Sequence, residues 1–171
     1  KYCNDKKIIC YASPFDKASI NFLIKNKNPI YKWGSSEIDK LGDLSLVAKQ
    51  KKKMIISTGM ANKIDIIQAL KVCKKFNNKN IILMHCVSSY PQKFENATIN
   101  KLDELKKFGF PLGFSDHSEN SFSAIMAVSK GIEFLEKHIT FDKKLKGPDH
   151  FYACEIKKFP KFVQDVRLAE K

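Results

Sequence analysis

The chain has 171 residues, of which 43% are hydrophobic and 29% charged, a composition typical of one globular domain with a sizeable core. Its net charge of +13 comes from 30 lysines and a single arginine, Arg167. Because sites that read bases rely on arginine, no nucleic-acid partner is expected, although a positive field would attract an anionic substrate. No apolar run reaches the length of a membrane span and no signal peptide is recognisable, so no membrane partner is expected.

Six segments repeat one pattern, an apolar run that ends in polar side chains. They lie at residues 8–12, 29–33, 54–56, 81–84, 113–118 and 135–140, with strand ends predicted near residues 13, 35, 58, 86, 115 and 138. Helical patterns fill the gaps between them. Asp16, Asp43 and Asn62 are candidate N-caps for the first three helices, the first running to about Lys27.

Three further helices are predicted in the second half of the chain. One spans about residues 97–108 and stops at Gly109, and another spans about residues 121–131. The last runs from about residue 155 to the end, and Pro160 would favour a later start because proline suits a first turn.

Near-continuous apolar strands, each followed by a helix, indicate a parallel sheet buried on both faces. Six such units fit most of a (β/α)8 TIM-type barrel, so residues 1–171 are predicted to form a single partial barrel domain. An open doubly wound sheet is the alternative, but no glycine-rich dinucleotide fingerprint supports it. Because the chain begins in mid-pattern at Lys1, we expect it to be a segment of a longer protein.

Two histidines end neighbouring predicted strands, His117 after residues 113–116 and His138 after residues 135–137. Since adjacent strands lie about 4.8 Å apart, both imidazoles could bind one divalent metal ion. Period-2 alternation places Ser115 on the side of His117 and Glu136 on the side of His138. Structural or surface histidines remain the alternative interpretation.

Five cysteines show no regular spacing, and the apolar surroundings of Cys10 and Cys86 predict buried thiols in a reducing compartment. A nucleophilic Cys86 beside His85 is disfavoured because adjacent strand residues point to opposite faces.

Several ordered motifs resemble the N-acetylneuraminate (sialic acid) synthase family over nearly the whole chain. They are Ser13-Pro14-Phe15, Tyr31-Lys32 with Ser35-Ser36-Glu37, Ser57-Thr58-Gly59-Met60, His85-Cys86-Val87-Ser88-Ser89-Tyr90-Pro91, Gly113 to Ser118, Glu136 to Thr140, and Gly147-Pro148-Asp149-His150. This resemblance implies a cytoplasmic enzyme that condenses phosphoenolpyruvate with an N-acetylated amino sugar, giving a sialic-acid-like nonulosonic acid and phosphate.

The resemblance also implies roles for individual residues. Glu37 would be the acid/base, and His117 and His138 would hold the divalent metal, with Mn²⁺ expected ahead of Mg²⁺ or Co²⁺. Tyr90, Glu136 and Asp149 would contact the sugar. The residues expected to bind phosphoenolpyruvate share a hydroxyl or ammonium group and are Ser13, Lys32, Ser35, Ser57, Ser88 and Ser115.

Family members carry two further strands upstream and a C-terminal antifreeze-like domain that caps the barrel of a partner in a homodimer. Neither is expected within these residues. The chain also departs from the family pattern at Ser88, Thr98 and residues 118–121 and 152–156, which leaves the amino sugar open. A non-catalytic remnant and a Schiff-base aldolase using Lys137 or Lys32 are the other hypotheses.

Overall fold

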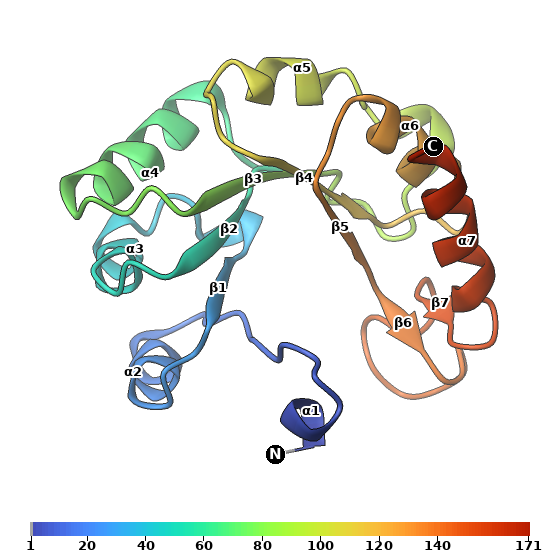
Figure 1. The fold of residues 1–171 in the computed structure, drawn as a ribbon, viewed down its shortest axis with the longest axis horizontal. Helices are drawn as coiled ribbons and strands as arrows, with labels where there is room; N and C mark the ends of the chain where they lie inside the picture. The colour runs from blue at the N-terminus through green and yellow to red at the C-terminus, as the bar shows by residue number, and fades with distance from the viewer. Residues whose placement is uncertain (1) are drawn as a thin grey trace. The chain divides into compact units, whose positions relative to one another are not determined.

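Five strands of the computed structural model, which describes residues 2–171, form one sheet in chain order (Figure 1). They are β1 (Ile30–Trp33), β2 (Lys53–Ser57), β3 (Ile81–Cys86), β4 (Leu112–Asp116) and β5 (Phe134–Lys137). β1 pairs in parallel with β2, and β4 with β5. A doubly wound sheet reverses its strand order at a switch point, so this uninterrupted order excludes that alternative and fits part of a TIM-type barrel.

A helix connects each pair of consecutive strands of the main sheet, as parallel pairing requires, and further helices lie before β1 and near the C-terminus. The helices are α1 (Tyr2–Asp5), α2 (Lys17–Lys25), α3 (Leu41–Ala48), α4 (Lys63–Lys75), α5 (Lys101–Lys106), α6 (Phe122–Ser129) and α7 (Phe159–Ala169), with 3-10 turns η1 (Ser35–Glu37) and η2 (Phe94–Asn96). None of the helices in residues 2–171 is long and apolar enough to cross a bilayer. The chain divides into two compact units, one ending at Leu83 and the other beginning at Met84.

In the first unit, α3 packs against both α2 and α4, and β1 pairs with β2. Tyr31 and Trp33 of β1 are each 1% exposed, while the intervening Lys32 is only partly buried, which is the alternation of a strand. Asp16 and Asn62 cap α2 and α4 as predicted, each in a reciprocal capping box with the third helical residue.

Three predictions for this unit are wrong. Asp43 does not cap α3, because that helix already begins at Leu41 and Asp43 lies in its first turn. Residues 8–12 form no strand and make only one parallel bridge, between Ala12 and Tyr31. The apolar side chains of that run stay in solvent, and Cys10 is exposed rather than buried.

The second unit packs α6 and α7 together beside β5 (Figure 1). Ala124 of α6 and Phe162 and Val166 of α7 form a buried cluster, which Leu135 of β5 also contacts. Pro160 lies in the first turn of α7, so the later start of this helix is confirmed. The helix predicted at 97–108 is shorter, since α5 spans only Lys101–Lys106 and residues 97–100, which follow η2, are not helical.

The strand predicted at 135–140 is interrupted at His138. Its first part is β5, whereas β6 (Ile139–Thr140) leaves the main sheet and pairs in parallel with β7 (Cys154–Glu155). The backbone N–H of Cys154 donates to the carbonyl of His138 at 2.9 Å. This small second sheet therefore fixes the segment before β7 against His138.

Candidate active site

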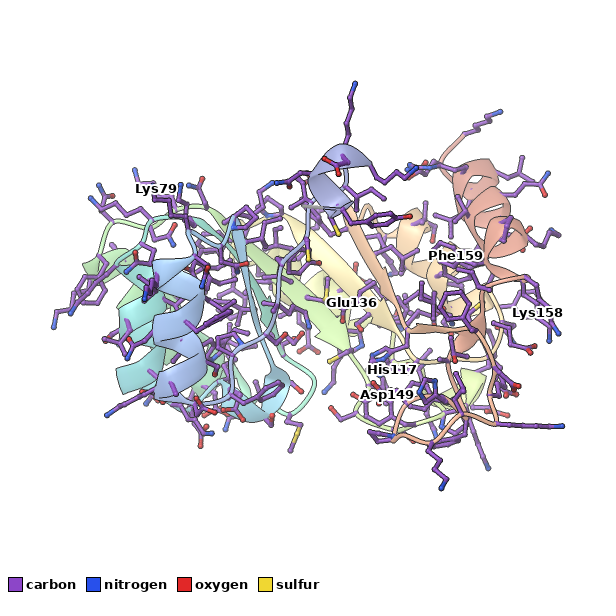
Figure 2. The ribbon with its side chains drawn as sticks, turned by 90° about the horizontal axis from the view of Figure 1, so that it is seen from below. Lys79, His117, Glu136, Asp149, Lys158 and Phe159 are labelled. Atoms are coloured by element: carbon purple, nitrogen blue, oxygen red, sulfur yellow. The ribbon has the colours of Figure 1, made fainter. Side chains whose placement is uncertain are left out.

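His117 and His138 lie next to each other in the second unit, as the sequence predicted. Ser115 stands opposite Glu136 in the β4–β5 ladder, and Asp116 stands opposite Lys137, so the two histidines come next in register. Their ring centroids are 5.3 Å apart and the rings are nearly perpendicular. Figure 2 labels His117 together with Glu136 and Asp149, which come from the same part of the fold.

His117 is held as a neutral imidazole. Its Nδ1 lies 2.8 Å from the backbone carbonyl oxygen of Val87, and since a carbonyl only accepts, Nδ1 carries the proton. The side chain is buried, and burial lowers the pKa of His117, which favours the uncharged ring. Nε2 is therefore the nitrogen with a lone pair.

Ser115 lies between His117 and Glu136. Its Oγ is 2.6 Å from Oε1 of Glu136 and 3.1 Å from Nε2 of His117. A serine hydroxyl has one proton, so when it donates to the carboxylate it cannot also donate to the imidazole. The Nε2 lone pair of His117 then faces a lone pair of the serine oxygen. A cation bound between them would relieve the repulsion.

His138 is anchored through the same ring nitrogen. Its Nδ1 lies 3.3 Å from Oδ2 of Asp149 and 3.2 Å from the hydroxyl of Tyr152. Within residues 2–171, nothing hydrogen-bonds to Nε2 of His138. Both histidines thus use Nδ1 for a supporting hydrogen bond and keep the lone pair of Nε2 for a metal ion. This arrangement is common among metal-binding histidines.

Tyr90 and Tyr152 pack against the histidine pair. The Tyr90 ring centroid is 4.3 Å from that of His117 and 4.9 Å from that of Tyr152. Burial raises the pKa of both tyrosines, and for Tyr152 the neighbouring Asp149 carboxylate adds to this effect. Tyr152 is buried, whereas Tyr90 is 45% exposed and so is accessible to a ligand.

These residues fit a divalent cation with two protein ligands. No group of three or more histidine, cysteine, aspartate or glutamate side chains suited to a metal ion occurs in residues 2–171. Two imidazole nitrogens would therefore leave coordination positions for water and for substrate oxygen atoms, which a catalytic rather than a structural metal site requires.

Lys137 points away from the histidine pair, because it alternates along the strand with Glu136 and His138. Its Nζ lies 2.9 Å from Oδ2 of Asp116 and also donates to the carbonyl of Ser118. The lysine side chain is only 5% exposed. An amine held as an ion-paired ammonium is a poor nucleophile, which argues against a Schiff base at this lysine.

Three of the predicted site residues lie at the end of β1 in the first unit. β1 ends at Trp33 and η1 begins at Ser35, so Lys32 and Ser35 need not obey a common strand alternation. Glu37 is 7% exposed, and Lys40 forms an ion pair with its Oε2 at 2.5 Å. The indole N–H of Trp33 donates to the Glu37 carbonyl at 2.8 Å and fixes this turn.

Ser57 ends β2 and is 3% exposed. Its hydroxyl has no hydrogen-bond partner in the described part of the chain. A buried hydroxyl without a partner is costly unless a ligand or water satisfies it, so Ser57 fits a binding role. Ser13 lies in the same unit and is partly buried, whereas Ser88 lies in the second unit and is exposed.

The sequence did not indicate Tyr152 or the Val87 carbonyl as supports of the histidines. A backbone carbonyl leaves no trace in a motif, and Tyr152 follows a loop that separates it from His138 in sequence. The Asp116–Lys137 pair did have a signal, because residues of opposite charge stand next to each other in the β4–β5 register.

The fold and this site together define a portion of a TIM-type barrel whose polar residues cluster at the carboxyl ends of its strands. The family model described as the NeuB family matches residues 1–171, and the chain belongs to that family.

Two curated relatives come from Campylobacter jejuni. The chain is 37% identical over 174 residues to an N,N'-diacetyllegionaminic acid synthase, covering 100% of this chain and 51% of the relative. It is 36% identical over 165 residues to a pseudaminic acid synthase, covering 95% and 48%. The chain thus spans about half the length of the curated relatives that it matches.

Two crystal structures superpose closely on this chain. The spore coat polysaccharide biosynthesis protein SpsE of Bacillus subtilis superposes with a TM-score of 0.93 at 34% identity, covering 99% of this chain and 48% of that one. The N-acetylneuraminic acid synthetase of Leptospira borgpetersenii, in complex with citrate, gives 0.91 at 34% identity, covering 98% and 59%.

Proposed function

We propose that the protein containing this chain condenses phosphoenolpyruvate with an N-acetylated amino sugar, releasing phosphate and forming a nonulosonic acid. The observation that carries this proposal is the His117–His138 pair, in which both Nδ1 atoms are anchored by neighbouring groups and both Nε2 atoms have a lone pair that could bind a metal ion. The names of the relatives, which are synthases of legionaminic, pseudaminic and N-acetylneuraminic acids, support the same reaction class.

The reaction joins C3 of phosphoenolpyruvate to the aldehyde carbon of the open-chain sugar. Water then adds at C2, and the C–O bond to phosphate breaks as the new carbonyl forms. A divalent cation held by His117 and His138, with Mn²⁺ expected and Mg²⁺ or Co²⁺ as alternatives, would polarise the aldehyde oxygen.

The proposed roles of the chain's own residues follow from their chemistry. Glu37, held by Lys40 and largely buried, would accept the proton of the attacking water and return it later. Ser57 would donate a hydroxyl hydrogen bond to a phosphate or carboxylate oxygen, and Lys32 would supply a positive charge. Ser115 would donate in the same way when its hydroxyl proton turns from Glu136 to the ligand. Ser13, Ser35 and Ser88 would complete the phosphoenolpyruvate contacts.

Tyr90, Glu136 and Asp149 are proposed as sugar contacts. Tyr90 offers a partly exposed ring beside His117, and Glu136 accepts a hydrogen bond from Ser115 at 2.6 Å. Asp149 is exposed enough to bind a hydroxyl while it also pairs with His138. We further propose that the full-length enzyme is a cytoplasmic homodimer, which fractionation and sedimentation would test.

The test is phosphate release from phosphoenolpyruvate by the full-length protein. N-acetylmannosamine, its 6-phosphate and diacetamido sugars would be offered singly, each with and without chelator, and product masses recorded. We expect release only with one sugar class and a divalent metal ion. His117→Ala and His138→Ala should each abolish it, and undiminished turnover in the double variant would refute the proposed metal role.

Two outcomes would favour the other hypotheses. A folded full-length protein that releases no phosphate with any sugar would indicate a non-catalytic family member. Borohydride trapping of pyruvate on Lys137 or Lys32, seen as a mass increase on a peptide, would indicate an aldolase.

A further inference from the structure

Tyr152 lies in the segment that the β6–β7 sheet holds against His138. The Ala153 N–H donates to the Asp149 carbonyl at 3.1 Å, which closes a turn and brings the side chains of Asp149 and Tyr152 to the same histidine. Tyr152 is 3% exposed, and its ring centroid is 5.3 Å from that of His138. Its position is therefore fixed from both the backbone and the ring face.

The hydrogen-bonding groups around Nδ1 of His138 decide whether the tyrosine hydroxyl donates to this nitrogen or accepts from it. The hydroxyl oxygen lies 3.2 Å from Nδ1 of His138, and Oδ2 of Asp149 lies 3.3 Å from the same nitrogen. An ionised carboxylate can only accept, so Nδ1 carries a proton that faces both Oδ2 of Asp149 and the hydroxyl oxygen, and the tyrosine oxygen accepts from Nδ1–H. This arrangement requires the His138 tautomer that carries its proton on Nδ1.

Asp149 alone is a weaker support for His138. Its side chain is 57% exposed, so water and salt compete for its 3.3 Å contact with Nδ1. Water cannot easily replace a hydrogen bond to a buried hydroxyl. The ring of Tyr152 also limits rotation of the imidazole by packing against its face.

We propose that Tyr152 is a positioning residue that holds His138 in the Nδ1–H tautomer and so prepares its Nε2 to bind a divalent cation. The proposal rests on the proposed function only for the identity of the ligand. Loss of such a supporting hydrogen bond typically weakens metal binding by roughly 10- to 100-fold. We expect Tyr152→Phe to have an effect of this size, because phenylalanine keeps the ring and removes only the hydroxyl.

The experiment measures Mn²⁺ affinity of the full-length protein without substrates, from the electron paramagnetic resonance signal of free Mn²⁺. Tyr152→Phe should raise the Kd by about 10-fold or more. The matched control is Tyr31→Phe, which removes a hydroxyl from a tyrosine that is 1% exposed in the first unit and should leave the Kd unchanged. Equal Kd values for Tyr152→Phe and the unmodified protein would overturn the proposal.

A second readout separates positioning from general destabilisation. Nitrogen-15 spectra of the His138 ring should give the Nδ1–H tautomer in the metal-free protein and a shift toward Nε2–H in Tyr152→Phe. Asp149→Asn keeps the tyrosine hydroxyl and should weaken Mn²⁺ binding less than Tyr152→Phe. A larger loss in Asp149→Asn would assign the support to the carboxylate instead.

Failure of the proposed function can be distinguished from failure of this inference. If the unmodified protein binds no Mn²⁺, Mg²⁺ or Co²⁺, the proposed metal site is wrong, while the tautomer measurement still decides what Tyr152 does to His138. If the unmodified protein binds metal and Tyr152→Phe binds it equally well, only the role of Tyr152 fails.

Discussion

Lys137 and Asp116 form a buried ion pair in the second unit, with 2.9 Å between Nζ and Oδ2 and side-chain exposures of 5% and 0%. The other carboxylate oxygen of Asp116 accepts from the backbone N–H of Ser118 at 2.9 Å and from its hydroxyl. The pair thus ties β5 to the turn that follows β4. It lies in the register position directly before the two histidines.

We predict that Lys137→Met lowers the free energy of unfolding by about 3–5 kcal/mol, because it leaves the Asp116 carboxylate buried without a counter-charge. The double variant Lys137→Met with Asp116→Asn should recover part of this loss. Urea denaturation of the full-length protein measures both. Lys143→Met is the control, since its pair with Glu119 is 34% and 64% exposed and should contribute less than about 1 kcal/mol. Similar losses in Lys137→Met and Lys143→Met would contradict this assignment.

A second prediction concerns thiol reactivity. Cys73 is 1% exposed, and burial raises its pKa to about 11. At pH 8 the thiolate, which is the reactive form, is therefore roughly a thousandth of this thiol, and the fraction grows only as the pH rises toward 11. Cys10 is exposed. Iodoacetamide at pH 8 should label Cys10 in the native protein while leaving Cys73 unmodified.

Peptide mass spectrometry after a timed reaction checks this order of labelling. Denaturation in guanidinium chloride should make the two cysteines react at similar rates, because both the burial and the pKa shift are then lost. Rapid native labelling of Cys73 would show that α4 opens far more readily than its packing implies.

The strand–helix repeat could be predicted because β2, β3 and β4 are short runs that become almost completely buried. The run at residues 8–12 is apolar, but the strand predicted there does not form. Ile8 and Ile9 are more than 60% exposed, and only Ala12 makes a bridge. Composition specifies that a segment can be buried. Whether a neighbouring strand is present to bury it depends on distant parts of the fold.

Some residues of the candidate site could likewise be predicted from local sequence, whereas others depend on distant parts of the fold. His117, His138, Ser115 and Glu136 follow from strand alternation and register, which are local rules. Tyr152 could not be found by such rules, because a separate two-stranded sheet brings it to His138. Its contacts depend on tertiary packing rather than on spacing along the chain.

Helix capping offers a direct test of one correction. Asn62 accepts from the backbone N–H groups of Ile64 and Asp65 at 2.7 and 3.1 Å, whereas Asp43, the cap that the sequence suggested, lies inside the first turn of α3. Asn62→Ala should cost about 1 kcal/mol of unfolding free energy. Asp43→Ala should cost clearly less, because it removes only a favourable charge near the helix N-terminus. Denaturation midpoints measured side by side would decide, and equal losses would restore Asp43 as a cap.

Substitution of two glycines by alanine should change the stability of the protein in opposite directions. A Cβ at Gly113 of β4 would lie 2.9 Å from Cε of Met84 and 3.2 Å from the backbone oxygen of Phe134. The methionine tip can move, but the carbonyl belongs to β5, so Gly113→Ala should destabilise the protein by about 1–3 kcal/mol. At Gly42 in α3 a Cβ would meet nothing within 4 Å. Gly42→Ala should stabilise by about 0.5–1 kcal/mol, because alanine loses less backbone entropy in a helix. Thermal melts of the two variants should therefore move in opposite directions. A stabilising shift in Gly113→Ala would mean that β4 and β5 are not packed as closely as these contacts require, and a destabilising shift in Gly42→Ala would contradict the open space at that position.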